Sequence, residues 1–267
     1  MAIRMLDALG GNIGALRFEP TEKRVRVSLG GEPVADTYRA RLVWEPRRIV
    51  PAYAVPIADL TAQLVPAGAE SGIDDDDTGR PVLDPSVPFD SHSCAGTPYD
   101  VIAGDQTGAA AAFAPEDSDL DGYAILKFDP FDWREEDEPI VGHPHDPFSR
   151  IDVLRSDRHV VVELDGTRLA ESSRPMLLFE TQLPVRFYLP REDVTADLEP
   201  SDTASYCAYK GRAHYFSLTG GPRDLAWTYP DPLHDAEPVR DRVCFFDEKV
   251  DVVVDGHRRD RPTTPWS

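Results

Sequence analysis

The chain has 267 residues with 48 acidic and 28 basic side chains, a formal net charge of −20, and 41% hydrophobic residues. This length allows one large domain or two small ones, and the hydrophobic content is typical of a globular protein rather than a disordered chain. The negative field repels nucleic acid and anionic lipid, so we expect neither as a partner.

The N-terminal segment, residues 1–19, does not resemble a signal peptide, because Asp7 interrupts its apolar residues and no small-residue cleavage site follows. No stretch approaches the roughly 18 apolar residues of a membrane span. Cys94, Cys207 and Cys244 are odd in number and widely spaced, which argues against a disulfide framework. We therefore expect a soluble protein in the reducing cytoplasm, without a membrane partner.

Short strands and turns are predicted from residue 24 onward. A β-branched strand at 24–27 precedes a glycine pair at 30–31, which suits a hairpin turn with positive φ. Further strands are predicted at 34–37 and 41–44, and a short helix at 57–64. The abundance of proline, 25 residues, favours short strands joined by many turns.

Three polar stretches follow, and each is predicted to be a loop or strand end. Residues 67–90 are rich in Gly, Pro and acidic side chains, including the run 74–77, and are predicted to be a solvated insertion. The acidic run 133–138 is predicted to be a solvated strand end. The segment 143–146, His-Pro-His-Asp, is interpreted as a linker, and no metal site is predicted.

The same order of elements returns in the second half of the chain. Residues 24–45 align without a gap on residues 159–180, with 8 of 22 positions identical, and 55–66 align on 189–200. Weaker matches pair 93–98 with 206–211, which equates two of the cysteines, and 127–133 with 245–251. The further predicted elements are strands at 160–162, 169–172, 176–179, 242–246 and 250–254, a helix at 191–198 and a hairpin at 206–218.

Internal self-similarity of this kind indicates a duplicated module. We predict a first, degenerate repeat at 20–145 that contains the insertion, a better preserved second repeat at 146–257, and a C-terminal tail at 258–267. Each repeat has an ordinary domain size.

The motifs of the second repeat, taken in order, resemble the domain-of-unknown-function 427 family: Glu-Ser-Ser-Arg-Pro at 171–175, Phe-Tyr-Leu-Pro-Arg-Glu-Asp-Val at 187–194, Cys-Ala-Tyr-Lys-Gly at 207–211 and Trp-Thr-Tyr-Pro at 227–230. The resemblance implies a mainly β fold of coiled antiparallel sheets, similar to β-tent proteins, with one or two short helices in each repeat. A nucleotidyltransferase label attaches to the family, but no Gly-Ser followed by an Asp-x-Asp pair, which would hold two metal ions, is present.

A functional interpretation brings the polar residues near the turns of the second repeat into one pocket. Arg174 and Lys210 would bind an anion, and Glu180 would act as a base or orient a cation. Cys207 is a candidate nucleophile if Lys210 or His214 lowers its pKa. The walls would come from aromatic side chains with polar tips, namely Tyr188, Tyr209, Trp227 and Tyr229.

Structural interpretations compete with these roles. Cys207 fits a small buried apolar group, and Arg174 with Glu180 fits a structural ion pair. The first repeat keeps Arg39 and Glu45 at the corresponding positions, which favours the structural interpretation of that pair. It lacks counterparts of Tyr209 and Lys210, and these two residues are therefore the stronger candidates for ligand contact.

Two functions follow, and the sequence leaves both open. The first is a protein that binds a small, anionic or carbonyl-bearing metabolite in the second repeat, with or without catalysis of a reaction. The second is a non-catalytic structural or interaction module in which the two repeats form a pseudo-dimer. The ligand, any cofactor, and the choice between monomer and homodimer are not specified by the sequence.

Overall fold

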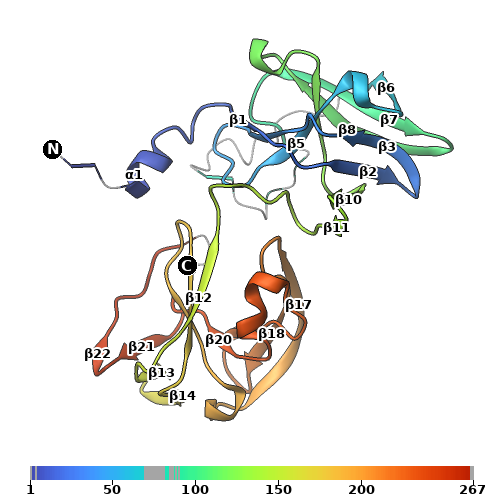
Figure 1. Cartoon of the computed structure of the whole chain (residues 1–267). Helices are drawn as coiled ribbons and strands as arrows, with labels where there is room; N and C mark the ends of the chain where they lie inside the picture. The colour runs from blue at the N-terminus through green and yellow to red at the C-terminus, as the bar shows by residue number, and fades with distance from the viewer. Residues whose placement is uncertain are drawn as a thin grey trace. The chain divides into compact units, whose positions relative to one another are not determined.

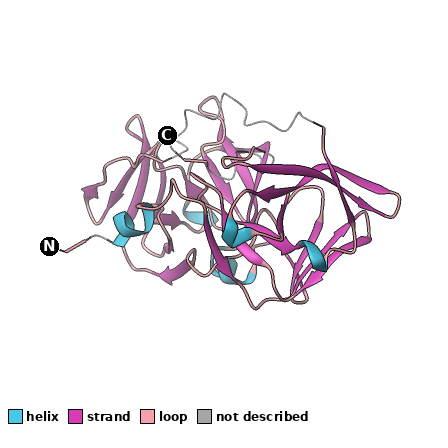
Figure 2. Ribbon diagram, turned by 90° about the horizontal axis from the view of Figure 1, so that it is seen from above, coloured by secondary structure: helices cyan, strands magenta, loops and turns pink. Residues whose placement is uncertain are grey.

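The computed structural model of the chain describes residues 2–3, 5–68, 82–83, 87, 89 and 91–264. Strands dominate both halves and helices are few and short (Figure 2), which confirms the predicted mainly β fold. The chain divides into two compact units, residues 1–146 and 147–267. The longest helices in the described part have six residues, far short of a membrane-spanning segment.

The first unit is built from short strands with a few helical turns between them (Figure 1). Its described elements are α1 (Met5–Gly10), β1 (Arg17–Pro20), β2 (Val25–Leu29), β3 (Glu32–Thr37), β4 (Arg41–Trp44), β5 (Ala52–Pro56), η1 (Ile57–Asp59), β6 (Gln63–Pro66), β7 (Gly96–Ala103), β8 (Gln106–Pro115), η3 (Ser118–Leu120), β9 (Tyr123–Leu126), β10 (Asp132–Glu135) and β11 (Glu138–Pro139).

The second unit repeats this pattern of short strands. Its described elements are β12 (Ile151–Arg155), β13 (Val160–Leu164), β14 (Thr167–Ser172), β15 (Met176–Glu180), β16 (Arg186–Tyr188), η4 (Arg191–Asp193), β17 (Leu198–Cys207), β18 (Gly211–Leu218), β19 (Ala226–Thr228), η5 (His234–Val239), β20 (Cys244–Phe245), β21 (Asp251–Val254) and β22 (His257–Arg258).

The strands pair in the same order in both units. The first unit has a sheet of order β1-β4-β5-β9-β8-β7-β6 and another of order β11-β10-β2-β3. The second has sheets β12-β15-β16, β17-β18-β19-β20 and β14-β13-β21-β22, and a bridge between Leu189 and Val243 connects the first two. With that bridge, β12 to β22 have the same order of neighbours as β1 to β11.

Turn geometry explains why the hairpins form where they were predicted. Gly30 and Gly31 both have positive φ, and so do Asp165 and Gly166 at the matching turn. Glycine adopts this conformation without the steric penalty of a Cβ atom. Apolar side chains of the two strands of each hairpin then alternate inward and form the core of their unit.

The two predicted helices are wrong beyond their first turn. Each forms one 3₁₀ turn after a proline, η1 and η4, and the chain then becomes extended. The backbone N–H of Thr61 bonds to Val34 O at 2.9 Å, and that of Thr195 bonds to Leu169 O at 2.9 Å. Because these N–H groups bond to carbonyl oxygens of the preceding hairpin, they are not available for the hydrogen bonds that would continue a helix.

Two of the weaker repeat matches are also wrong in register. Cys207 ends β17, whereas Cys94 precedes β7, which corresponds to β18, so the two cysteines are not counterparts. Trp133 pairs with Val27 and Val252 pairs with Val162, which shifts the match of 127–133 by one residue. Most of the predicted insertion 67–90, including Asp74–Asp77, and the end of the tail lie outside the described residues.

Candidate functional site

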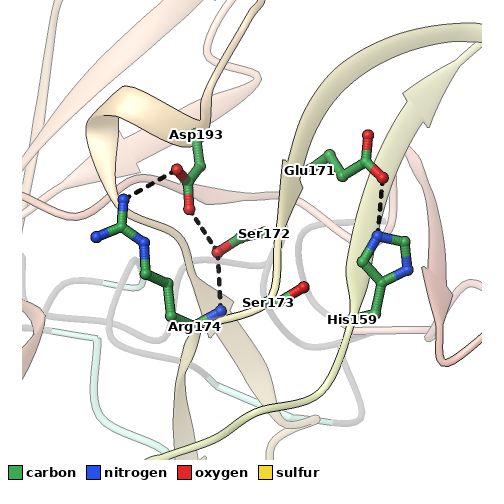
Figure 3. Close-up of a pocket in the computed structure, with 6 residues that line it drawn as sticks. All are labelled: His159, Glu171, Ser172, Ser173, Arg174 and Asp193. Carbon is green, nitrogen blue, oxygen red and sulfur yellow. Dashed lines mark hydrogen bonds and ion pairs between the residues drawn. The ribbon is translucent and has the colours of Figure 1, made fainter.

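A pocket of about 330 Å³ opens on the second unit, where the β13–β14 hairpin meets the η4 turn. It is lined entirely by polar residues: His159, Glu171, Ser172, Ser173, Arg174 and Asp193. Figure 3 shows one ion pair on each side of it, with the two serines between them. We call it the Arg174 pocket. Its volume lies at the lower end of the range for small-molecule sites.

One wall of the Arg174 pocket is a hydrogen-bonded frame. Ser172 Oγ donates to Asp193 at 2.7 Å and accepts from the backbone N–H of Arg174 at 3.2 Å. Arg174 Nη2 donates to Asp193 at 3.1 Å and to Glu192 at 2.8 Å. Burial opposes ionisation of Asp193, but the bonds from Arg174 and Ser172 outweigh it and lower the pKa of this carboxyl.

Arg174 keeps donor capacity for a ligand. All of its hydrogen bonds to described residues use Nη2, so Nη1 and Nε have no partner in that part of the chain. The Arg174 side chain is 61% exposed. Ser173 is also exposed, and its hydroxyl has no bond to a described residue. Both residues line the same pocket and carry hydrogen-bond donors.

The opposite wall of the Arg174 pocket is the pair of His159 and Glu171. His159 Nε2 lies 2.8 Å from Glu171 Oε1, and Arg168 bonds to the other oxygen of the same carboxylate. The bond from His159 lowers the pKa of Glu171. Both carboxylates of the pocket therefore already have cationic or hydroxyl partners, which reduces their repulsion of an anionic ligand.

The first unit has a similar frame of hydroxyl, carboxylate and arginine. Thr37 Oγ1 donates to Asp59 at 2.6 Å and accepts from the N–H of Arg39 at 3.0 Å, and Arg39 also bonds to Asp59. Arg24 holds Asp36 through two bonds, in the place of the His159–Glu171 pair. The position of Ser173 is occupied by Tyr38, with Arg24 Cζ 5.8 Å from its ring centroid.

Arg174 and Glu180 do not pair with each other, contrary to the structural interpretation drawn from the sequence. Arg174 lies before the first residue of β15 and Glu180 is its last residue. Four residue steps along β15 span about 13 Å, so the two side chains serve opposite ends of the strand. Arg174 pairs with Asp193 and Glu192, and Glu180 pairs with Lys210.

Lys210 and Glu180 form a largely buried ion pair. Lys210 Nζ lies 2.5 Å from Glu180 Oε2, and the side chains are 10% and 18% exposed. Burial would lower the pKa of Lys210, but the neighbouring Cys207 and Glu180 outweigh it and raise the pKa. A lysine held in its charged form by a carboxylate is a poor nucleophile or base, so this arrangement favours a structural role for the pair.

The aromatic residues predicted as pocket walls lie in the core. Trp227 Nε1 donates to Tyr188 Oη at 3.0 Å, and the Tyr188 and Tyr229 ring centroids are 6.4 Å apart. Burial raises the pKa of Tyr188 and Tyr229 well above the ordinary value. Tyr209 is buried in the turn between β17, which ends at Cys207, and β18. Of the predicted set, Arg174 alone lines the Arg174 pocket.

Other polar features of the sequence have structural partners. His214 is exposed on β18. His143 Nδ1 lies 2.8 Å from Pro144 O, and His145 Nδ1 lies 3.1 Å from Glu135 Oε2. Glu135, predicted to be solvated, is buried because it alternates inward on β10. Within the described residues, no three His, Cys, Asp or Glu side chains are placed to hold a metal ion.

The three cysteines are expected to differ in reactivity. Burial and the adjacent Glu45 raise the pKa of Cys94 to about 12, and complete burial raises the pKa of Cys244. At neutral pH a thiol with a pKa near 12 has on the order of 10³-fold less thiolate than a free cysteine. We therefore expect iodoacetamide to alkylate Cys207 first, as followed by peptide mass spectrometry. Faster labelling of Cys94 or Cys244 in the folded chain would contradict these assignments.

The sequence pointed to Arg174 but not to the five other lining residues: His159, Glu171, Ser172, Ser173 and Asp193. These residues lie at the end of the β13–β14 hairpin or in the η4 turn, and only the folded arrangement brings the two segments together. A signal was nevertheless available, because Thr37, Arg39 and Asp59 align with Ser172, Arg174 and Asp193 in the repeat.

A comparison with protein-family models matched residues 152–256, and the matching model is described as a domain of unknown function, DUF427. The match covers the strands from β12 to β21 and includes all but one of the secondary-structure elements of the second unit. No curated protein matched the chain. The match bears out the resemblance seen in the motifs of the second repeat and does not extend to the first. Residues 152–256 of this chain thus form a domain of the DUF427 family.

Proposed function

We propose that the second unit binds a small anionic metabolite in the Arg174 pocket. The observation that carries this proposal is the donor set of Arg174, whose Nη1 and Nε have no partner among the described residues, in a pocket that is also lined by the exposed Ser173. The planar guanidinium suits a carboxylate, which can accept two parallel hydrogen bonds from it.

The charges at the pocket come close to balance despite the net charge of the chain, because Arg168, Arg174 and the nearby Arg242 face the carboxylates of Glu171, Glu192 and Asp193. Each carboxylate of the pocket is already paired, Asp193 with Arg174 and Glu171 with His159 and Arg168. The remaining field of the protein, with its net charge of −20, is screened beyond about 10 Å at ordinary ionic strength. Binding should therefore be weak at low salt and should not weaken strongly as salt is raised to 0.15 M.

The proposal is binding without a chemical step. His159, the one imidazole among the lining residues, is engaged through Nε2 with Glu171. Ser173 has no hydrogen bond to a base within the described residues, so it lacks the partner that activates a serine nucleophile.

Thermal unfolding in the presence of citrate, succinate, acetate and inorganic phosphate tests the proposal. A ligand at 100 times its Kd stabilises the folded state by about 2.7 kcal/mol, which raises the unfolding temperature of a unit of this size by on the order of 10 °C. We expect the carboxylates to produce this rise and Arg174→Met to abolish it.

Arg39→Met is the matched control, because it breaks the same exposed ion pair in the first unit. It should leave the ligand-dependent rise intact. Failure of all four anions to stabilise the chain, or equal loss of the effect in both variants, would refute binding in the Arg174 pocket.

A further inference from the structure

We infer that the residue at position 173 decides which unit binds, so that Ser173 keeps the pocket of the second unit open while Tyr38 closes its counterpart in the first. This inference rests on the proposed function of the Arg174 pocket. It adds a binding stoichiometry of one per chain and a residue that determines it.

Positions 38 and 173 are equivalent by strand register. Thr37 pairs with Val25 at the end of one hairpin, and Ser172 pairs with Val160 at the end of the other. Tyr38 and Ser173 are the next residues in each case. The flanking hydrogen bonds agree as well. In both units the hydroxyl of the preceding residue, Thr37 or Ser172, accepts from the backbone N–H of the following arginine, Arg39 or Arg174.

The Tyr38 ring lies against Arg24. Its centroid is 5.8 Å from Arg24 Cζ, and Arg24 with Asp36 forms the wall that corresponds to His159 with Glu171. In the second unit that wall borders a cavity of about 330 Å³, because the serine side chain ends at its hydroxyl. Tyr38 thus places a phenol ring beside this wall at the position where the second unit has only a serine hydroxyl.

The contact that holds the ring is weak enough to be altered by one substitution. Tyr38 is 62% exposed, so its contact with Arg24 is a surface cation–π interaction and the ring has little other packing. Removing the ring should expose the hydrogen-bonded frame of Thr37, Arg39 and Asp59 without unfolding the first unit. Adding a ring at position 173 should close the Arg174 pocket.

Equilibrium dialysis with radiolabelled citrate measures both the affinity and the number of sites. We expect the wild type to bind one citrate per chain, Ser173→Tyr to bind at least tenfold more weakly, and Tyr38→Ser to bind about two. Ser173→Ala keeps the cavity but removes one hydroxyl donor, so it should bind citrate more weakly than the wild type and more tightly than Ser173→Tyr. Thermal unfolding of each variant shows that it is folded.

The outcomes separate the two proposals. If the wild type binds no citrate at all, the proposed function and this inference both fail. If the wild type binds one citrate and Ser173→Tyr binds it equally well, the function stands and the role of position 173 is overturned. A Tyr38→Ser chain that still binds one citrate overturns the claim that the first unit is closed by its tyrosine.

Discussion

Replacing Arg186 with methionine is expected to destabilise the second unit by about 3–5 kcal/mol, a large part of the stability of a small domain. Arg186 Nη1 and Nη2 bond to the two oxygens of Glu248 at 3.0 and 2.6 Å, and the Glu248 side chain is fully buried. Asp247 lies 3.7 Å from the same guanidinium. Without Arg186, a buried carboxylate would have lost its main cationic partner.

Urea unfolding of the second unit, followed by the fluorescence of Trp227, measures this loss. Arg174→Met is the control, because it breaks an exposed ion pair and should cost no more than about 1 kcal/mol. The double variant Arg186→Met, Glu248→Leu should recover part of the loss, since it removes the unpaired charge. Equal effects of Arg186→Met and Arg174→Met would contradict the account of the buried pair.

The second large effect concerns Glu135 in the first unit. Its carboxylate accepts from Tyr53 Oη at 2.9 Å and from the backbone N–H of His145 at 2.9 Å, and pairs with Lys23 Nζ at 2.5 Å. Burial would raise the pKa of Glu135, but the bonds from His145 and Lys23 outweigh it and lower the pKa from 4.5 to about 2. This shift corresponds to about 3 kcal/mol of stability when the carboxylate is ionised.

The sign of the pH dependence follows from that lowered pKa. The stabilisation is fully present above pH 4.5, the value for the unfolded chain, and is lost as the pH falls toward 2. Glu135→Gln should therefore cost about 3 kcal/mol at pH 7, and its difference from the wild type should shrink between pH 4.5 and 2. Chemical unfolding of both chains across this range measures the difference.

Glu138→Gln is the control for this pH profile, because Glu138 is exposed three residues away on β11. It should change stability by no more than about 0.5 kcal/mol at any of these pH values. A constant difference between Glu135→Gln and the wild type from pH 7 to 2 would show that Glu135 does not carry the shift.

The fold was predictable where the local sequence pattern and the contacts between distant segments favour the same structure. The hairpins at residues 30–31 and 165–166 follow from β-branched runs and turn residues that accept positive φ. The helices predicted after Pro56 and Pro190 failed because nearby hairpins take the backbone donors of Thr61 and Thr195. This competition for backbone N–H groups arises from contacts between segments that are distant in sequence, so the local sequence does not reveal it.

The site was predicted less well because residue type alone does not give exposure. Tyr188, Trp227 and Lys210 have the chemistry of a pocket, yet packing places them inside the unit. Ser173 carries no chemical signal of its own. The role that we infer for it rests on its small size and on the comparison with Tyr38 at the matching position.

The most direct test of the central claim is a citrate titration of the ¹⁵N-labelled chain, followed by NMR of the backbone amides. Binding in the Arg174 pocket predicts saturable shifts at residues 171–174 and at Asp193, with none at residues 36–39. Shifts centred on Lys210 and Glu180 instead, or no saturable shift anywhere in the second unit, would contradict it.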